Sequence, residues 1–461
     1  MAALKEIADG TGAAMARAFR AGEASPVAVT EHLLDRIGRS RADNIFLAVT
    51  AERALDEARA SEARYRAGSP LSPLDGVPLA WKDLLDLAGT RTTAGSHLLG
   101  QGAMKTADHI LAARATAAGM VNLGKLNMTE LAFSGLGLNP NYGTARNPWG
   151  KSEAHAPGGS SSGSGTAVAA RLVPIAIGTD TGGSVRVPAA FNGVVGFKTS
   201  TGRIEKGNMI PLARSFDTVG PLARSVEDCA LMDGVLRGGE SVVSAPGSLA
   251  GLAVVVPENI VFDDAQDAVK ANFERTLRLL EDGGARIRRM RLESLDAALA
   301  VGAQHGSLVA AEAYEEYGKL VEGPDGSAID RRVVARILGG KPVGAAGLEA
   351  IRARRVELKK MLAGELDGAL LAMPTVAVTA PKVAPLEADD AVFHKINILV
   401  LRNTALGNML DLCGVALPDG LDGAGMPTSF LLSAVHGEDK AALAAAWALE
   451  SAIGDWRNAV S

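Results

Sequence analysis

Cysteine, aromatic residues and charge of one sign are all scarce in this chain of 461 residues. It contains two cysteines, Cys229 and Cys413, and 4% aromatic residues. Two cysteines are too few for the disulfide framework of a small secreted protein. The 47 basic and 52 acidic residues give a formal net charge of −5, and Lys and Arg form no long run. The composition therefore gives no support for a nucleic-acid partner.

Long hydrophobic runs are missing as well. The longest apolar stretches, at 172–178 and 249–257, are much shorter than the ~20 residues that a membrane helix needs. Charged residues interrupt the first 22 residues, which is typical of an amphipathic helix and not of a signal peptide. Because 47% of the residues are hydrophobic, the chain can build a large core. We therefore expect a cytoplasmic globular protein with no membrane partner.

Short apolar runs alternate with segments of helical periodicity. We expect strands at 77–81, 120–123, 173–177, 194–198, 252–256 and 369–376. We expect helices from Pro26 onward and at 51–66, 107–118, 167–172, 264–280, 297–366 and 440–452. The alternation predicts an α/β protein with a largely parallel or mixed sheet. The best candidate boundary, 238–248, is not expected to separate independent domains.

The segment Gly158–Gly165 consists only of glycine and serine. Such a composition fits a flexible linker, a phosphate-binding turn or a tight structural turn. A linker between two buried elements would leave backbone groups unpaired inside the protein, which argues against the first alternative. The segment also lacks the Gly-Lys-Ser/Thr ending of a Walker-type loop.

A second unusual segment, Gly178–Pro188, follows a predicted buried strand. It contains a Gly182-Gly183 turn and then Ser184. A serine in this position can be a nucleophile, because the backbone N–H groups of the turn point toward one spot beside its hydroxyl. The alternative is that Ser184 only caps a helix.

A serine nucleophile needs a base, and the histidines offer no convincing one. His155 lies next to the Gly/Ser segment, but a lone histidine is more often structural. No cluster of His, Asp or Glu has metal-ligand spacing, so we expect no metal. Lys82, which follows the apolar run Val77–Trp81, is either a strand-end charge or a desolvated base. Lowering the pKa of a lysine from about 10.4 to near 7 requires roughly 4–5 kcal/mol, and requires Asp83 to point away.

Taken together, these segments resemble the amidase signature family. The similarity covers Asp75–Asp83, Gly158–Gly165 and Gly178–Pro188 in this order, with Ser160 and Ser184 separated by 24 residues. Further similar segments extend over nearly the whole chain, at 124–130, 146–149, 193–198, 217–224, 373–375 and 402–404. The resemblance implies one α/β body with a mixed, mostly parallel central sheet covered by helices.

The resemblance also implies a single domain over residues 1–461. Its expected parts are N-terminal helices at about 1–70, a catalytic region at about 71–240 and a variable helical region at about 290–366 that forms part of the substrate pocket. The family's apparatus is a Ser–cis-Ser–Lys triad. Carried over by position, it makes Ser184 the nucleophile, Ser160 the relay on a cis peptide bond after Gly159, and Lys82 the base.

Further site residues follow from the same resemblance. Ser162 departs from the glycine of many family members and adds a third hydroxyl, but the spacing favours Ser160 over Ser161 or Ser162 as the relay. Asp180 and Arg186 are expected to support the loop. The oxyanion hole is expected to consist of four backbone N–H groups, those of Thr181, Gly182, Gly183 and Ser184. The candidates for the substrate pocket are Met128, Phe133, Ser134, Glu312 and Tyr314.

The predicted function is hydrolysis of the carbon–nitrogen bond of a small-molecule amide through a serine acyl-enzyme. The products would be a carboxylate and ammonia or an amine, with no cofactor. On the resemblance we also expect a homodimer. One alternative is the glutaminase component, the A subunit, of a tRNA-dependent amidotransferase, although Asn403–Leu410 looks closer to free-standing amidases. A more remote alternative is a non-catalytic protein that binds an anion or a nucleotide.

Overall fold

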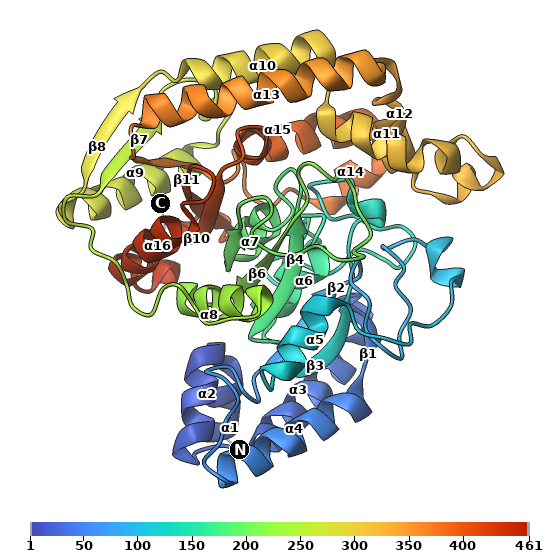
Figure 1. The fold of residues 1–461 in the computed structure, drawn as a ribbon, viewed down its shortest axis with the longest axis vertical. Coiled ribbons are helices and arrows are strands. Elements are labelled where there is room, and N and C mark those ends of the chain that lie inside the picture. The colour runs from blue at the N-terminus through green and yellow to red at the C-terminus, as the bar shows by residue number, and fades with distance from the viewer. Residues whose placement is uncertain (1, 459–461) are drawn as a thin grey trace.

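A computed structural model describes residues 2–458 (Figure 1). One sheet of eleven strands runs through the molecule in the order β1-β3-β2-β4-β6-β5-β10-β11-β9-β7-β8. The strands are β1 (Phe46–Val49), β2 (Pro78–Lys82), β3 (Val121–Leu126), β4 (Ile175–Asp180), β5 (Val195–Lys198), β6 (Thr218–Ala223), β7 (Ala253–Pro257), β8 (Arg286–Met290), β9 (Leu370–Pro374), β10 (Cys413–Leu421) and β11 (Pro427–Ala434). The predicted single α/β body is confirmed.

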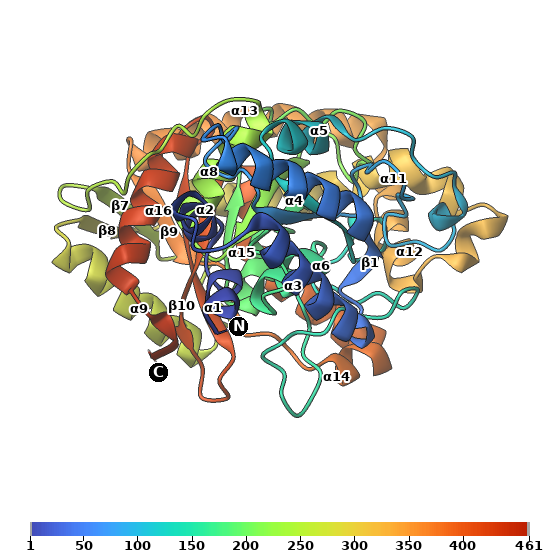
Figure 2. The same cartoon turned by 90° about the horizontal axis from the view of Figure 1, so that it is seen from below.

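Helices surround this sheet. They are α1 (Ala2–Asp9), α2 (Gly12–Ala21), α3 (Pro26–Arg39), α4 (Ala51–Arg66), α5 (Ile110–Ala117), α6 (Ser162–Ala169), α7 (Arg186–Asn192), α8 (Val226–Arg237), α9 (Asp267–Asp282), α10 (Glu293–His305), α11 (Leu308–Val321), α12 (Arg331–Leu338), α13 (Gly344–Leu366), α14 (Val383–Ala388), α15 (Asp390–Met409) and α16 (Asp439–Ile453). The N-terminal helices α1–α4 gather at one end of the molecule (Figures 1 and 2), and α10 and α13 lie side by side at the other (Figure 1).

The sheet is mixed, as expected, but parallel pairing is not the majority. Among the described residues, four strand pairings are parallel, β2–β3, β2–β4, β7–β8 and β7–β9, and the other six are antiparallel. The expectation of a mostly parallel sheet is corrected because β5, β6, β10 and β11 form an antiparallel centre between two parallel parts.

Most predicted elements are present with small shifts in their ends, and α4 has the predicted bounds. The predicted cap of α3 is confirmed, since Ser25 Oγ accepts the N–H groups of Val27 and Ala28. Strands β1, β6, β8, β10 and β11 were not predicted from the sequence.

The strand that leads into the site is buried on both faces. Leu79 and Trp81 of β2 belong to one hydrophobic core cluster, and Ala80 between them belongs to the other. Successive side chains of a strand point to opposite faces, so both faces of β2 pack against apolar layers. A charged group at the end of this strand is therefore removed from water. Within residues 2–458, no helix has both the length and the apolar character needed to cross a membrane.

Candidate active site

The three predicted segments meet at one edge of the sheet. Strands β2 and β4 are parallel neighbours, so their carboxyl ends, at Lys82 and Asp180, lie at the same edge. Ser160 lies shortly before α6, and Ser184 lies in the turn between β4 and α7. Ligands of α/β proteins commonly bind outside the carboxyl ends of parallel strands.

Lys82 and Ser160 are in direct contact. Lys82 Nζ lies 2.7 Å from Ser160 Oγ and 2.7 Å from Thr179 Oγ1. Both Lys82 and Ser160 are fully buried. The Gly159–Ser160 peptide bond is cis, as the resemblance implied.

The surroundings of Lys82 favour the neutral amine. Burial lowers the pKa of Lys82 to about 7, although the charges of Asp217 and Asp180 act in the opposite direction. Asp83 points away, because its Oδ1 lies 2.6 Å from Lys125 Nζ in a buried ion pair. A lowered pKa of Lys82 requires Asp83 to point away from it, and the structure shows this orientation. Near neutral pH a large fraction of Lys82 can accept a proton.

The three neighbouring serines differ in their contacts. Ser161 Oγ lies 3.3 Å from both the backbone oxygen and the backbone nitrogen of Thr179. Ser162 Oγ is buried and makes no hydrogen bond within the described part of the chain. Of these serines, only Ser160 hydrogen-bonds to Lys82 in residues 2–458. The contacts thus agree with the preference for Ser160 that came from the spacing.

The Gly/Ser segment is not a flexible linker. Its residues from Gly158 to Gly165 are buried. The N–H of Gly159 donates to Gly135 O at 2.8 Å, and the N–H of Gly163 donates to Asn127 O at 2.8 Å. These two backbone donors are used inside the protein and are not available to a phosphate.

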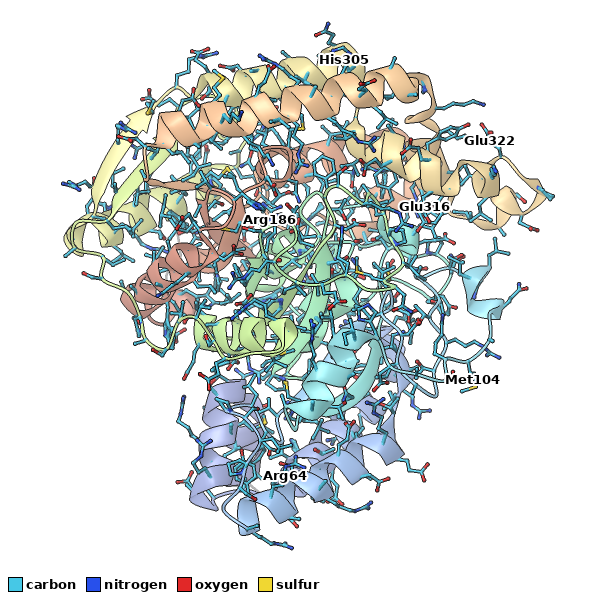
Figure 3. All side chains as sticks on the ribbon, viewed as in Figure 1. Arg64, Met104, Arg186, His305, Glu316 and Glu322 are labelled. Atoms are coloured by element: carbon cyan, nitrogen blue, oxygen red, sulfur yellow. The ribbon has the colours of Figure 1, made fainter. Side chains whose placement is uncertain are left out.

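The Asp180 carboxylate holds the turn that carries Ser184. Its Oδ1 accepts the N–H of Gly183 at 2.9 Å and Asn408 Nδ2 at 2.9 Å, and its Oδ2 accepts the N–H of Val185 at 3.2 Å. Arg186 forms a buried ion pair with Asp180 at 2.9 Å, and its side chain lies near the middle of the molecule (Figure 3). Burial alone would raise the pKa of Asp180, but Arg186 holds it well below its usual value. The supporting role expected for Asp180 and Arg186 is consistent with these contacts.

Ser184 does not cap a helix. The N-cap position of α7 is Val185, and no side chain caps this helix. Ser184 is 5% exposed, and its hydroxyl makes no hydrogen bond with another described residue. The capping alternative is therefore wrong, and the hydroxyl of Ser184 is available for a substrate.

The expected oxyanion hole needs one correction. The N–H of Gly183 is already donated to the Asp180 carboxylate. The N–H groups of Thr181, Gly182 and Ser184 donate to no acceptor in residues 2–458. The turn thus offers three uncommitted donors instead of the four expected from the resemblance.

Two residues of this site were not identified from the sequence. Thr179 Oγ1 contacts Lys82 directly, and Asp217 Oδ1 accepts the hydroxyl of Thr181 at 2.6 Å. Asp217 also accepts the N–H of Leu212 at 3.0 Å, so it fixes the loop beside the turn. Both residues lie inside segments on which the family resemblance was based, and this was the only available signal.

A cavity of about 430 Å³ opens at the turn. Thr181 and Gly182 line it together with side chains of α10 and α15. Of the predicted pocket residues, Phe133 lines this cavity. Met128 does not, because it is fully buried in the core. Ser134 donates to Asn397 Oδ1 at 3.1 Å and is not part of the lining.

The prediction that Glu312 and Tyr314 line the substrate pocket is also wrong for the cavity at the turn. Glu312 accepts the N–H of Ser215 at 3.0 Å and pairs with Arg352 at 2.8 Å. Tyr314 donates to Glu322 at 3.2 Å. Neither side chain lines the cavity at the turn.

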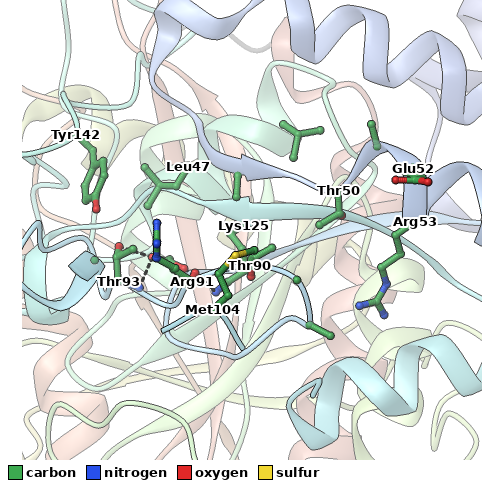
Figure 4. A pocket seen from close by; sticks show the side chains of 17 residues that line it. Leu47, Thr50, Glu52, Arg53, Thr90, Arg91, Thr93, Met104, Lys125 and Tyr142 are labelled. Atoms are coloured by element: carbon green, nitrogen blue, oxygen red, sulfur yellow. Dashed lines mark hydrogen bonds and ion pairs between the residues drawn. The ribbon is translucent and has the colours of Figure 1, made fainter. Parts of the chain in front are cut away.

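A second cavity, of about 720 Å³, lies elsewhere and is shown in Figure 4. Its lining includes Lys125, which is paired with Asp83, and Arg53, which is paired with Asp108 at 2.7 Å. Lys82, Ser160 and Ser184 line neither cavity, but the smaller one includes Thr181 and Gly182 of the turn that carries Ser184. The smaller cavity is therefore the candidate substrate site.

Residues 2–458 contain no group of three or more His, Cys, Asp or Glu side chains that can hold a metal ion. His155 Nδ1 lies 3.1 Å from Glu153 O and contacts no serine of the site.

Comparison with known proteins identifies the family. A family model described as Amidase matches residues 28–443. The chain belongs to the amidase family. The resemblance to amidase signature enzymes is therefore confirmed, and the chain is a hydrolase of this family.

Relatives in this family have different names. The glutamyl-tRNA(Gln) amidotransferase A subunit of Ralstonia pickettii (strain 12J) is 32% identical in an alignment of 498 positions, gaps included. The alignment covers 96% of this chain and 98% of that protein. The 2-amino-5-chloromuconic acid deaminase of Comamonas testosteroni is 33% identical over 421 residues, which cover 89% of each chain.

Solved structures agree with the fold over nearly the whole chain. A crystal structure of an amidase has a TM-score of 0.83 at 29% identity and covers 95% of this chain and 99% of that one. A chain from a vestigial protein complex, linked to the evolutionary origins of an s-triazine catabolic enzyme, has a TM-score of 0.85 at 28% identity, with coverages of 97% and 99%.

Proposed function

We propose that this amidase family member hydrolyses a small-molecule amide through an acyl-enzyme on Ser184. The observation that carries the proposal is the 2.7 Å contact between Lys82 Nζ and Ser160 Oγ. Because burial lowers the pKa of Lys82 to about 7, this contact joins a hydroxyl to an amine that can be neutral at physiological pH.

The proposed reaction begins with proton transfer along two hydroxyls. Neutral Lys82 accepts the proton of Ser160, to which it is hydrogen-bonded. Ser160 in turn accepts the proton of Ser184, a transfer for which the two hydroxyls, not hydrogen-bonded to each other in the structure, must approach when substrate is bound. The Ser184 oxygen then forms a bond to the amide carbonyl carbon, and the carbonyl oxygen becomes an oxyanion. The proton returns from Lys82 through Ser160 to the departing nitrogen as the carbon–nitrogen bond breaks. Water repeats the cycle on the ester and releases the carboxylate.

The N–H groups of Thr181, Gly182 and Ser184 would stabilise the oxyanion. They are uncommitted among the described residues and belong to the turn that carries the nucleophile. Loss of a single donor of this kind costs about 2.7–4 kcal/mol in a protease. The side chains of Asp180 and Asp217 each accept a hydrogen bond from this turn, so the donors would not have to rearrange during the reaction.

The test is ammonia release from a panel of small amides by the wild type and three single variants. Lys82→Ala, Ser160→Ala and Ser184→Ala should each lower kcat/KM by at least about 10²-fold, the low end for a general base. Ser162→Ala is the matched control, because it removes a buried hydroxyl that makes no hydrogen bond in residues 2–458. Equal activity of Ser160→Ala and Ser162→Ala would contradict the assigned relay.

The second candidate function is that of a glutaminase subunit. It is supported by the names of several relatives, among them the amidotransferase A subunit of Ralstonia pickettii. Glutamine carries an ammonium group beside its carboxylate, and a buried ammonium needs an acidic partner. The described residues that line the cavity at the turn include no Asp or Glu. We therefore favour a stand-alone amidase.

Assembly distinguishes the two candidates. We propose a homodimer that hydrolyses amides without a partner protein, with a mass in solution twice the 47.4 kDa of one chain. Light scattering coupled to gel filtration would measure this mass. Glutamine hydrolysis that appears only after a second protein is added would instead favour the amidotransferase component.

A further inference from the structure

Two residues that line the cavity at the turn each carry a buried nitrogen donor that has no acceptor among the described residues. One belongs to Asn397 of α15 and the other to Arg336 of α12, and both residues line the cavity. Most of the remaining lining is apolar and includes Phe216, Ile351 and Leu406. Buried donors without partners are rare in folded proteins and are costly, so a pair in one cavity points to a ligand that accepts from both.

The orientation of the Asn397 amide is fixed by its surroundings. Asn397 is fully buried, and its Oδ1 accepts the N–H of Gly135 at 2.8 Å and the hydroxyl of Ser134 at 3.1 Å. A backbone N–H can only donate, so the oxygen and not the nitrogen of the amide must face Gly135. The Nδ2 group therefore faces the other way, and it has no acceptor among the described residues.

Arg336 is a cation without a counter-ion in the described part of the chain. It forms no ion pair or hydrogen bond with another described residue, and its Nε is buried. Its guanidinium carbon lies 4.4 Å from the centre of the Phe133 ring, over the face of that ring. Burial lowers the pKa of Arg336 to about 10, with no acidic group acting in the opposite direction, so the side chain stays positively charged at neutral pH.

The neighbouring arginines show that this lack of a partner is specific to Arg336. On the same helix, Arg331 pairs with Asp390 at 2.7 Å and Arg332 pairs with Asp330 at 2.8 Å. Arg402, which also lines the cavity, donates to Val261 O at 3.0 Å and to Asp263 O. Among the described residues, Arg336 is thus the cavity-lining cation that remains available for a ligand.

We propose that Arg336 and Asn397 bind a carboxylate of the substrate, so that the enzyme prefers amides that also carry a carboxylic acid. This inference rests on the proposed function, because it places the scissile carbonyl at the turn with Thr181 and Gly182 in the same cavity. A carboxylate is planar and accepts several N–H groups, which matches a guanidinium and an amide that line the same cavity. A substrate with an ammonium group is not matched, since the cavity supplies cations and no acidic side chain among its described lining residues.

The first experiment compares matched amides. The probes are the monoamides of butanedioic, pentanedioic and hexanedioic acid, each paired with the straight-chain amide of the same length, and 4-carbamoylbenzoic acid paired with 4-methylbenzamide. For at least one pair, the acid should have a kcat/KM about 10- to 100-fold above that of its neutral partner. No preference for the acid in any pair would overturn the inference.

The same ratio is then measured in variants. Arg336→Met keeps the approximate volume of the side chain and should lower the acid-to-neutral ratio by about 10- to 100-fold, while Arg336→Lys should restore part of it. Arg331→Met is the matched control on the same helix, where the arginine is exposed and paired with Asp390. A ratio that is the same in Arg336→Met and in the control would overturn the inference.

A binding measurement separates this inference from the proposed function. In Ser184→Ala, calorimetry measures the dissociation constants of the monoamide of hexanedioic acid and of hexanamide without turnover. The acid should bind at least about 10-fold more tightly, and Arg336→Met should remove the difference. If this holds but the wild type hydrolyses no amide, the proposed function fails alone. If amides are hydrolysed but the acid binds no better than hexanamide, the carboxylate site fails alone.

Discussion

Lys82 depends on its neighbours along the chain. Trp81 and Ala80 lie in opposite core layers, so the end of β2 is buried, and Asp83 turns away toward Lys125. An adjacent carboxylate that faced Lys82 would keep the amine protonated. Because Asp83 pairs with Lys125 and not with Lys82, the amine of Lys82 can lose its proton near neutral pH.

The family resemblance implied the contact between Lys82 and Ser160, because each residue lies in a segment that matches the family. It did not predict Thr179, although Thr179 Oγ1 is as close to Lys82 as Ser160 is. It also did not predict that the N–H of Gly183 is used by Asp180. Backbone donors have no signal in a sequence, and their partners depend on the dihedral angles of the turn.

The pKa of Lys82 predicts how activity depends on pH. In the proposed reaction the neutral amine is the active form, and its fraction rises as the pH increases through about 7. For an amide with no titratable group, kcat/KM should therefore rise with pH and level off above about pH 8. Steady-state kinetics between about pH 5.5 and 9 measure this profile. A profile that is flat or falls through neutral pH would contradict the role of Lys82.

At the scale of elements, the unit formed by β4, the turn and α7 depends on Gly183. Its φ of +137° lies in a region that residues with a side chain rarely adopt, and an added Cβ would overlap Thr404 Oγ1. Thr404 cannot move freely, because its hydroxyl donates to Gly182 O at 2.7 Å. The turn can therefore keep its shape only with glycine at this position.

We expect Gly183→Ala to lower kcat by about 10²- to 10³-fold, because the N–H groups at the oxyanion would be displaced. Circular dichroism would verify that the variant is folded. Gly239→Ala is the control, since a Cβ at Gly239 meets no atom within 4 Å and its φ is not positive. Wild-type kcat in Gly183→Ala would show that the turn does not need this geometry.

The buried ion pair between Asp180 and Arg186 supports the same unit. Arg186→Met would leave the Asp180 carboxylate buried without its cation. Breaking a buried pair in this way costs about 3–5 kcal/mol. Thermal or denaturant unfolding should show a loss of this size. Arg331→Met, which breaks the exposed pair with Asp390, should change stability little. Equal effects of the two substitutions would contradict the structural role of the buried pair.

Two of the missed strands, β6 and β10, have compositions that argue against a strand. β6 contains the pair Gly220-Pro221, which is a turn signal, and β10 contains Pro418, Asp419 and Gly420. In the structure, the pairing of β10 with β11 changes register between Pro418 and Gly420. Proline and glycine are thus tolerated at an irregularity of the sheet, which only the tertiary structure defines.

At the scale of the whole molecule, the order of the strands was out of reach of the sequence. β10 and β11 lie between β5 and β9, although about half of the chain separates β5 from β10. The cavity at the turn is likewise assembled from distant segments that contain Phe133, Phe216, Arg336 and Asn397. No local motif links these segments, so Met128 was wrongly included among the pocket residues. The division into N-terminal, catalytic and pocket regions stays a prediction.

Buried carboxyl groups link the stability of the whole molecule to pH. Burial raises the pKa of Asp419 in β10 to about 7, although Thr428 donates a hydrogen bond to it. At pH values between the ordinary pKa of an aspartate and about 7, Asp419 is therefore protonated to a greater extent in the folded protein than in the unfolded chain. Its contribution to stability is largest at low pH and is lost as the pH rises through about 7.

Asp419→Asn removes this titration. The melting temperature of the variant relative to the wild type should therefore increase as the pH rises from about 5 to about 8. Differential scanning calorimetry at several pH values measures the difference. Asp56→Asn, at an exposed aspartate, should show no such trend. A difference for Asp419→Asn that does not vary with pH would contradict the raised pKa.

The central claim of a lysine-to-serine-to-serine relay is tested most directly by covalent labelling of the nucleophile. The protein is treated with an alkyl fluorophosphonate over a range of pH, and the adduct is located by peptide mass spectrometry. The relay predicts one adduct, on Ser184, with a labelling rate that rises with pH through about 7 and falls by at least about 10²-fold in Lys82→Ala and Ser160→Ala. An adduct on another serine, or labelling of Ser184 at an unchanged rate in Lys82→Ala, would contradict it.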